Sequence, residues 1–142
     1  MDMKLVMTAE EVTHLIMTGF GQEHRYFELE ELRAGFVRAR QPFRPWMRRP
    51  GNVISGPALF AAADLAMYAV VLAHVGPQLM AVTSNLTLNF LSKGAPADVI
   101  AECQLLKLGR RLAVMEVKLR CGEDPDLVAV ATGTYALPST PN

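Results

Sequence analysis

The chain has 142 residues, of which 51% are hydrophobic and 20% charged, and its 14 basic residues balance its 14 acidic ones. This length fits one domain with a hydrophobic core, and the composition is that of an ordinary water-soluble globular protein. The zero net charge argues against a nucleic-acid partner or a general attraction to anionic membranes.

The two cysteines, Cys103 and Cys121, occur without a CxxC motif or a cysteine–histidine cluster. This pattern argues against a disulfide scaffold or a zinc site and predicts free thiols in a reducing compartment. The N-terminal stretch MDMKLVMTAEE lacks the long apolar segment of a signal peptide. We therefore expect a cytoplasmic protein.

The longest apolar run covers residues 57–75 and is interrupted by Asp64 and His74. Gly76 and Pro77 follow it at once. We therefore expect a buried core helix rather than a membrane span. Asp64 is notable there, because a carboxylate removed from water is costly unless it is paired or hydrogen-bonded.

In chain order, Thr8 and Glu11 form a capping-box pattern, which predicts a short amphipathic helix over about Ala9 to Phe20. Residues 26–30 and 32–40 then indicate two strands, arranged as a hairpin.

The stretch QPFRPWMRRPG, residues 41–51, carries three prolines and a glycine and is predicted to be a loop. The central helix follows. Ser55 or Gly56 can cap its start, and Pro57 suits its first position. Gly76 suits its C-terminal cap, and the proline that follows prevents continuation.

The sequence period then changes to two, which is typical of strands. In AVTSNLTLNFL one predicted face carries Val82, Leu86, Leu88 and Phe90, and the other carries Thr83, Asn85, Thr87 and Asn89. Three more strands are predicted in VIAECQLLKL, LAVMEVKLR and LVAVATGTYAL, separated by GRR and CGEDPD. Short connections favour antiparallel neighbours. The expected class is α+β, an antiparallel sheet wrapped around one long central helix.

This element order, with SGPALFAAAD opening the central helix, resembles the hotdog-fold thioesterases. The branch it most resembles is that of the phenylacetyl-CoA thioesterase-like acyl-CoA hydrolases. There the helix opens with His-Gly-Gly and carries an acid two turns later; here Ser55-Gly56-Pro57 and Asp64 take those places. The stretch VTSNLTLNFLSKGAPADVIAECQLLKLGRRLAVMEVKL resembles the family's strands and hairpin, so the likeness covers residues 53–137.

Three departures bear on rate, on substrate and on whether this chain hydrolyses anything. Ser55 replaces the family's histidine, and Pro57 replaces its second glycine. The family's asparagine or glutamine, about six residues before the histidine, falls at Arg49, with Asn52 nearby.

Thioester hydrolysis needs a donor for the developing oxyanion and a base or nucleophile. Pro57 has no N–H, so the Gly56 N–H is the natural oxyanion donor at the helix start. Asp64 would activate water or attack the carbonyl directly. Asp64 lies seven residues past Pro57, about 10 Å along the helix, and this separation suggests a site shared between two helices. The resemblance implies a homodimer with interfacial sites, or a tetramer formed by two such dimers.

Ser55 can cap the helix or touch the thioester carbonyl, and capping is the more frequent role. The resemblance implies that Thr83, or its neighbour Ser84, binds the attacking water; a solvent-facing threonine is the alternative. Candidate contacts for the phosphates of coenzyme A are Arg48, Arg49, Lys93, Arg110 and Arg111, although each could be a solvated surface charge.

The aromatic loop residues Phe43 and Trp46, with Met47, could line an acyl pocket or simply pack on the core. His74, near the end of the helix, needs no role beyond a favourable charge–dipole interaction.

The leading hypothesis is an acyl-CoA thioesterase acting on a medium-chain or aryl acyl group. Coenzyme A would enter as part of the substrate, and no further cofactor or metal is expected. A hydratase ranks lower, because the motif that opens the helix has no histidine. A non-catalytic protein that binds acyl-CoA or another small ligand is the main alternative, prompted by Ser55 and Pro57.

Overall fold

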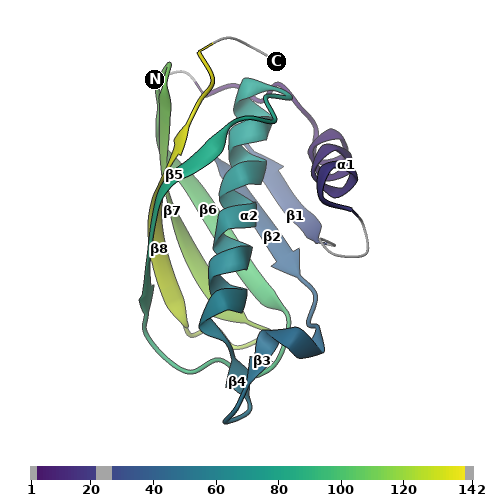
Figure 1. Ribbon diagram of the computed structural model, residues 1–142, viewed down its shortest axis with the longest axis vertical. Coiled ribbons are helices and arrows are strands. Elements are labelled where there is room, and N and C mark those ends of the chain that lie inside the picture. Colours follow the sequence, from purple (N-terminus) through teal and green to yellow (C-terminus); the bar gives the residue numbers. More distant parts are fainter. Residues whose placement is uncertain (1–2, 22–26, 140–142) are drawn as a thin grey trace.

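The computed structural model describes residues 3–21 and 27–139. One long helix, α2 (Gly56–Val75), lies lengthwise against one face of a curved six-stranded sheet (Figure 1). The strands are β1 (Glu28–Arg33), β2 (Phe36–Gln41), β5 (Val82–Phe90), β6 (Val99–Leu108), β7 (Leu112–Cys121) and β8 (Ala129–Ala136). Their order is β1-β2-β6-β7-β8-β5, and every neighbouring pair is antiparallel. The predicted α+β architecture is confirmed.

Helix α1 (Ala9–Phe20) packs beside α2 and β1 (Figure 1). The predicted capping box is present: the Thr8 N–H donates to the Glu11 carboxylate at 2.9 Å, and the Glu11 N–H donates to the Thr8 hydroxyl at 3.1 Å. Val12 and Ile16 are buried beneath it. The apolar stripe of the sequence therefore faces the core, as expected for an amphipathic helix.

Helix α2 begins at Gly56, so Pro57 occupies its second position rather than the predicted first. Ser55 is the N-cap, and its Oγ accepts from the Ala58 N–H at 3.2 Å. Gly76 ends the helix with φ +92°, a backbone conformation that favours glycine. Within the described ranges α2 is the helix long and apolar enough to cross a membrane, but 67% of its most apolar window is buried inside the protein. It is the core helix.

The β1–β2 hairpin turns at Gly35, which has φ +78°. The N–H of this buried glycine donates to Nε2 of His74 at 2.8 Å, and Nδ1 of His74 lies 2.7 Å from the Val70 carbonyl oxygen. A ring nitrogen that accepts a hydrogen bond carries no proton, so His74 is neutral here. The predicted charge–dipole role is therefore wrong: His74 is buried and pins the end of α2 to the hairpin. The start of the predicted first strand, at 26, lies outside the described residues.

Residues 41–51 are more ordered than the predicted loop. They contain a 3₁₀ turn (Pro45–Met47) and a two-residue strand β3 (Arg48–Arg49) that pairs with β4 (Val53–Ile54). Met47 is fully buried, and its carbonyl accepts from the Ser55 N–H at 2.8 Å. This anchor fixes the segment against the start of α2.

Strand β5 departs from the predicted alternation. Leu86 lies opposite Gly133 on β8, whereas Thr83 lies opposite Tyr135, and the register shifts between Thr83 and Asn85. Residues directly opposite each other on paired strands point to the same face of a sheet. One extra residue in a strand therefore moves the side chains before it to the other face. The bulge therefore places Thr83 on the helix-facing side together with Leu86, and the predicted placement of Thr83 on the opposite face is wrong.

The sheet face remote from α2 is polar. Along β7, buried residues alternate with more exposed ones, whereas β6 begins with three buried residues before it alternates. Ion pairs link Arg38 to Glu30 at 3.3 Å and Arg120 to Glu102 at 3.0 Å on neighbouring strands. The chemistry of the molecule must therefore be sought on the side of α2.

Candidate active site

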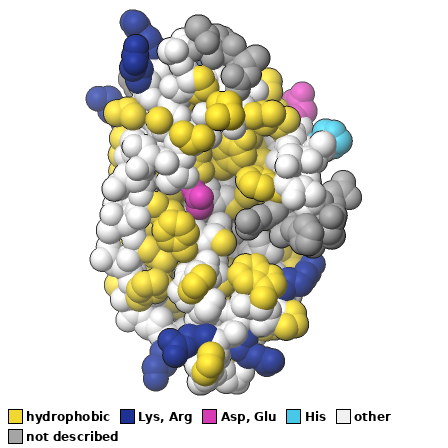
Figure 2. Space-filling model, in the orientation of Figure 1, with side chains coloured by type: hydrophobic (Ala, Val, Ile, Leu, Met, Phe, Trp, Pro, Cys, Tyr) yellow, Lys and Arg dark blue, Asp and Glu magenta, His cyan; other side chains and the backbone are white. Residues whose placement is uncertain are grey.

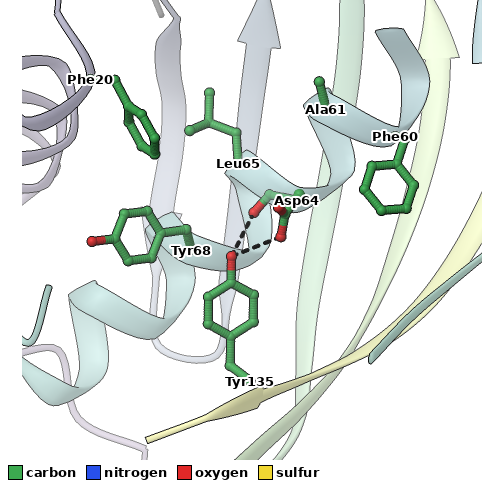
Figure 3. Close-up of a pocket in the computed structure, with 7 residues that line it drawn as sticks. All are labelled: Phe20, Phe60, Ala61, Asp64, Leu65, Tyr68 and Tyr135. Carbon is green, nitrogen blue, oxygen red and sulfur yellow. Dashed lines mark hydrogen bonds between the residues drawn. The ribbon is translucent and has the colours of Figure 1, made fainter. Parts of the chain in front are cut away.

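Asp64 projects from the middle of α2 into a cavity of about 270 Å³ between α2, α1 and β8 (Figure 3). The cavity is lined by Phe20, Phe60, Ala61, Asp64, Leu65, Tyr68 and Tyr135. Asp64 is the charged member of this set, and four of the seven lining side chains are aromatic. An isolated acid in an apolar cavity is a frequent arrangement at functional sites.

Two hydroxyl groups hold the Asp64 carboxylate. The Thr83 hydroxyl on β5 donates to Oδ1 at 2.6 Å, and the Tyr135 hydroxyl on β8 donates to the same oxygen at 2.8 Å. The Tyr135 oxygen also lies 3.2 Å from the main-chain carbonyl oxygen of Asp64. Hydrogen bonds to the charged form offset the cost of placing a carboxylate on an apolar helix.

Tyr135 is the functional candidate that the sequence analysis missed. It is 3% exposed, and burial together with the Asp64 charge raises the pKa of its hydroxyl far above the ordinary tyrosine value. The signal was present in the alternation of LVAVATGTYAL, which puts Tyr135 on the inward face with Ala131. A tyrosine on an inward face needs a partner for its hydroxyl, and that partner is Asp64.

An aromatic row extends from Asp64 towards α1 (Figure 3). The rings of Tyr135 and Tyr68 are stacked with centroids 6.1 Å apart, and Phe20 meets Tyr68 edge-on at 6.3 Å. The Tyr68 hydroxyl donates to the Leu79 carbonyl at 3.1 Å, and burial raises its pKa. The cavity therefore suits an uncharged, apolar group.

Gly56 lies at a second opening. With Pro57, Phe60, Leu88 and Phe90 it lines an apolar groove of about 570 Å³. No group in the described part of the chain accepts a hydrogen bond from the Gly56 N–H. This N–H is free to bind a ligand oxygen at the positive end of the helix dipole. Phe60 also lines the Asp64 cavity, so the two openings adjoin.

The Gly56 amide and the Asp64 carboxylate are not brought together within one subunit. They lie eight positions apart along α2, which corresponds to about 12 Å at 1.5 Å per residue. The sequence-based expectation that one chain alone cannot present both groups to one carbonyl is consistent with this geometry.

The other predicted residues near the helix start have varied roles. Ser55 caps α2, as the sequence favoured. Asn52 adopts φ +61° in the β3–β4 turn and is exposed. Arg49 is exposed and lines a groove of about 550 Å³ that also contains Ser92 and Lys93. Arg49 and Lys93, two of the predicted phosphate contacts, are thus placed beside the Gly56 groove.

Arg110 and Arg111 lie elsewhere. They connect β6 to β7, and the Leu137 N–H donates to the Arg111 carbonyl at 2.8 Å. This connection is at the end of the sheet where α2 finishes, opposite to Arg49. Basic side chains accordingly gather at both ends of the face that carries α2 (Figure 2). Ser84 occupies the β5 bulge and is exposed.

Met47 is fully buried in the core and is not among the residues that line the Asp64 cavity or the two grooves beside Gly56. Trp46 is 56% exposed, and the Phe43 N–H donates to Asp98 at 2.8 Å. The aromatic lining of the Asp64 cavity comes from α1, α2 and β8, and a role of residues 43–47 in an acyl pocket stays a prediction.

The cysteines are poor candidates for a nucleophile. Burial raises the pKa of the Cys121 thiol to about 11 and that of Cys103 further still, so both remain protonated at neutral pH. Within residues 3–21 and 27–139 no cluster of three or more His, Cys, Asp or Glu side chains could hold a metal ion. The available chemistry centres on Asp64.

Comparisons with known proteins agree with this geometry. The model of the thioesterase superfamily matches residues 51–128, more than half of the chain. A curated protein of Saccharolobus solfataricus, named as a candidate esterase, is 31% identical over 111 residues, 78% of this chain and 72% of its own length.

Solved structures show the same architecture. A candidate thioesterase from Silicibacter sp. TM1040 is 36% identical, with a TM-score of 0.86 over 96% of this chain and 95% of its own. The phenylacetic acid degradation protein PaaI from Thermus thermophilus shares the fold, with a TM-score of 0.69, 23% identity and coverage of 87% of this chain and 98% of its own. The chain therefore belongs to the thioesterase superfamily and has its hotdog fold.

Proposed function

We propose that this protein is an acyl-CoA thioesterase that hydrolyses a medium-chain or aryl acyl-CoA to the free acid and coenzyme A. The observation that carries the proposal is the Asp64 carboxylate, held by two hydroxyl donors in the wall of an aromatic cavity. The apolar lining suits an uncharged acyl group, and the name of the Thermus PaaI protein supports an aryl one.

In the proposed reaction, the oxygen of a water molecule bonds to the thioester carbonyl carbon. Asp64 accepts the proton of that water, or attacks the carbon itself before water releases the acid. The carbon–sulfur bond breaks, and the coenzyme A thiolate leaves and takes up the proton that the water gave to Asp64 or, where Asp64 attacks first, the proton released when water cleaves the acyl-enzyme bond. The Gly56 N–H stabilises the oxyanion that forms on the carbonyl oxygen. The Ser55 hydroxyl keeps its own hydrogen, because its cap bond uses only the oxygen, so it can assist at the same carbonyl.

We further propose that the active protein is a homodimer formed along β5, which is an edge strand of the sheet. Asp64 contacts Thr83, near the start of β5, and Gly56 neighbours Phe90, at its end. A two-fold axis near Leu86 and Thr87 would therefore bring Gly56 of one subunit towards Asp64 of the other. The separation within one chain supports this arrangement, and two such dimers could form the tetramer that the resemblance implies.

The same two-fold axis explains why basic residues occur at both ends of the face. It would bring Arg110 and Arg111 of one subunit towards the end that carries Arg49 and Lys93 of the other. These side chains are proposed to bind the phosphates of coenzyme A. The free thiols of the chain support a reducing, cytoplasmic setting.

The test is coenzyme A release, followed with a thiol-reactive dye, from a panel of aryl- and alkyl-acyl-CoA substrates. Asp64→Asn should lower kcat by about 10²–10⁴-fold, the usual contribution of a general base or nucleophile. Asp126→Asn, an exposed change in the loop before β8, is the matched control and should retain turnover. Full turnover by Asp64→Asn would show that Asp64 does not carry the chemistry.

One observation favours the second candidate, a non-catalytic protein that binds acyl-CoA or another small ligand. The helix opens with Ser55 and Pro57 instead of a histidine and a second glycine, and the Ser55 oxygen is used as a cap. This candidate predicts saturable binding of an acyl-CoA, measured by calorimetry, without release of coenzyme A. Hydrolysis of the panel at enzymatic rates excludes it.

A further inference from the structure

We propose that Tyr135 is a positioning residue for Asp64: with Thr83 it holds Oδ1, so that the chemistry takes place at Oδ2. The inference deepens the proposed function, and its kinetic part rests on that function. Its structural part concerns only how the carboxylate is held and can be tested in a protein that hydrolyses nothing.

The first observation is the asymmetry of the carboxylate. Both hydroxyl donors, Thr83 at 2.6 Å and Tyr135 at 2.8 Å, bind Oδ1. Within the described ranges no group donates to Oδ2. An oxygen that already accepts two hydrogen bonds is a weaker base than its bare neighbour, so Oδ2 is the oxygen ready to take a proton or to attack carbon.

The second observation is that Tyr135 is a fixed donor. Its ring is 3% exposed and stacks on Tyr68, and β8 carries it from the interior of the sheet. Burial and the Asp64 charge raise the pKa of Tyr135, so its hydroxyl keeps its proton at neutral pH. That single proton serves the shorter contact, to Oδ1, in preference to the 3.2 Å contact with the main-chain oxygen.

The third observation is the composition of the surroundings. Among the residues that the structure describes, Tyr68, one turn further along α2, and Tyr135 on β8 are the other titratable side chains that line the cavity. Thr83 on β5 and Phe20 on α1 also face the cavity, and neither side chain is titratable. Asp64 is therefore the carboxylic acid among the described residues that line the cavity.

The first test uses the wild-type chain, labelled with carbon-13 at the aspartate Cγ and the tyrosine Cζ. The Tyr135 Cζ signal should change with pH at the same midpoint as the Asp64 carboxyl signal, because the hydrogen bond couples them. Asp64→Asn and Tyr135→Phe assign the two signals. A Tyr135 Cζ signal that does not change when Asp64 is protonated overturns the proposal.

The second test removes the donors one at a time. Tyr135→Phe and Thr83→Val each leave the charged carboxylate with one hydrogen bond fewer, so it protonates at higher pH. The acid limb of the kcat profile should move up by about one pH unit, and kcat should fall about ten- to a hundredfold with KM changed less than about threefold. Thr134→Val removes a hydroxyl from the position next to Tyr135, on the opposite face of β8. This control should change neither the acid limb of the profile nor kcat.

The two tests separate the possible failures. If the wild type releases no coenzyme A, the proposed function fails, while the carbon-13 titration still decides how Asp64 is held. If Tyr135→Phe leaves both that titration and the acid limb unchanged in an active enzyme, the role of Tyr135 is overturned. Should Tyr135→Phe not fold, Tyr26→Phe and Tyr68→Phe assign the Tyr135 signal by elimination, because the chain has three tyrosines, and the wild-type titration then decides whether Tyr135 holds Asp64.

Discussion

Single side chains decide how closely α2 can approach the sheet. A Cβ atom on Gly133 would lie 2.2 Å from Cε of Met67 and 3.0 Å from the Asn85 carbonyl oxygen. Real Cβ atoms do not approach other atoms so closely. The absence of a side chain at this position of β8 thus lets the core helix lie against the strand, two residues before Tyr135. The position of the catalytic candidates depends on this contact.

We predict that Gly133→Ala destabilises the protein by about 1–3 kcal/mol, the usual cost of an overpacked core. Equilibrium unfolding in urea measures the change. Gly19→Ala is the matched control, since nothing lies within 4 Å of a Cβ at that exposed position of α1. It should be neutral or stabilising by up to about 1 kcal/mol. Equal stability of Gly133→Ala and the wild type would contradict the close packing.

At the scale of elements, α2 is fixed at both ends by contacts that its apolar sequence does not reveal. Met47 anchors the segment that leads into the helix, through the bond from the Ser55 N–H. His74 joins its last turn to the β1–β2 hairpin by accepting from the buried Gly35 N–H. These two hydrogen bonds fix the position of the helix along the sheet.

His74→Leu should lower the free energy of unfolding by about 1–3 kcal/mol, because it leaves the buried Gly35 N–H without an acceptor. His74→Gln, whose side-chain oxygen can still accept, should lose less. Urea unfolding of both variants provides the measurement. A leucine variant as stable as the wild type would show that the hydrogen bond contributes nothing net.

At the scale of the whole molecule, the two faces of the sheet differ. The outer face carries ion pairs, whereas the face with α2 and β5 exposes large apolar side chains (Figure 2). Among them Phe60 is 43%, Phe90 61% and Leu91 55% exposed. Exposed apolar surface beside an unpaired edge strand is typical of a subunit interface.

Thr87→Glu should therefore convert the proposed dimer into monomers, because it places like charges close to the two-fold axis. Sedimentation equilibrium should show the mass falling from twice the 15.6 kDa subunit mass to that mass alone. Coenzyme A release should also fall, because the proposed site is shared between the two subunits. Thr134→Glu, on β8 away from the edge, is the control and should stay dimeric. A fully active monomer would refute the shared site.

The sequence alone was sufficient for the two helices, for the strands of the main sheet and for the fold class, but not for the short β3–β4 pair. Capping residues set the bounds of α1 and the C-terminal end of α2, and period-two alternation identified the strands. Asp64 was recognisable as a candidate because a charge within an apolar helix needs a partner or a function. Local pattern carries this information, since hydrophobic periodicity and caps depend on neighbouring residues.

Tertiary structure decided what surrounds Asp64. The β5 bulge turns Thr83 towards the helix, and Tyr135 meets Asp64 across 71 positions of sequence. The aromatic lining joins α1, α2 and β8, and the neutral His74 depends on a hairpin 39 positions away. A one-residue register shift and the meeting of distant strands arise only from packing, because no local propensity encodes them.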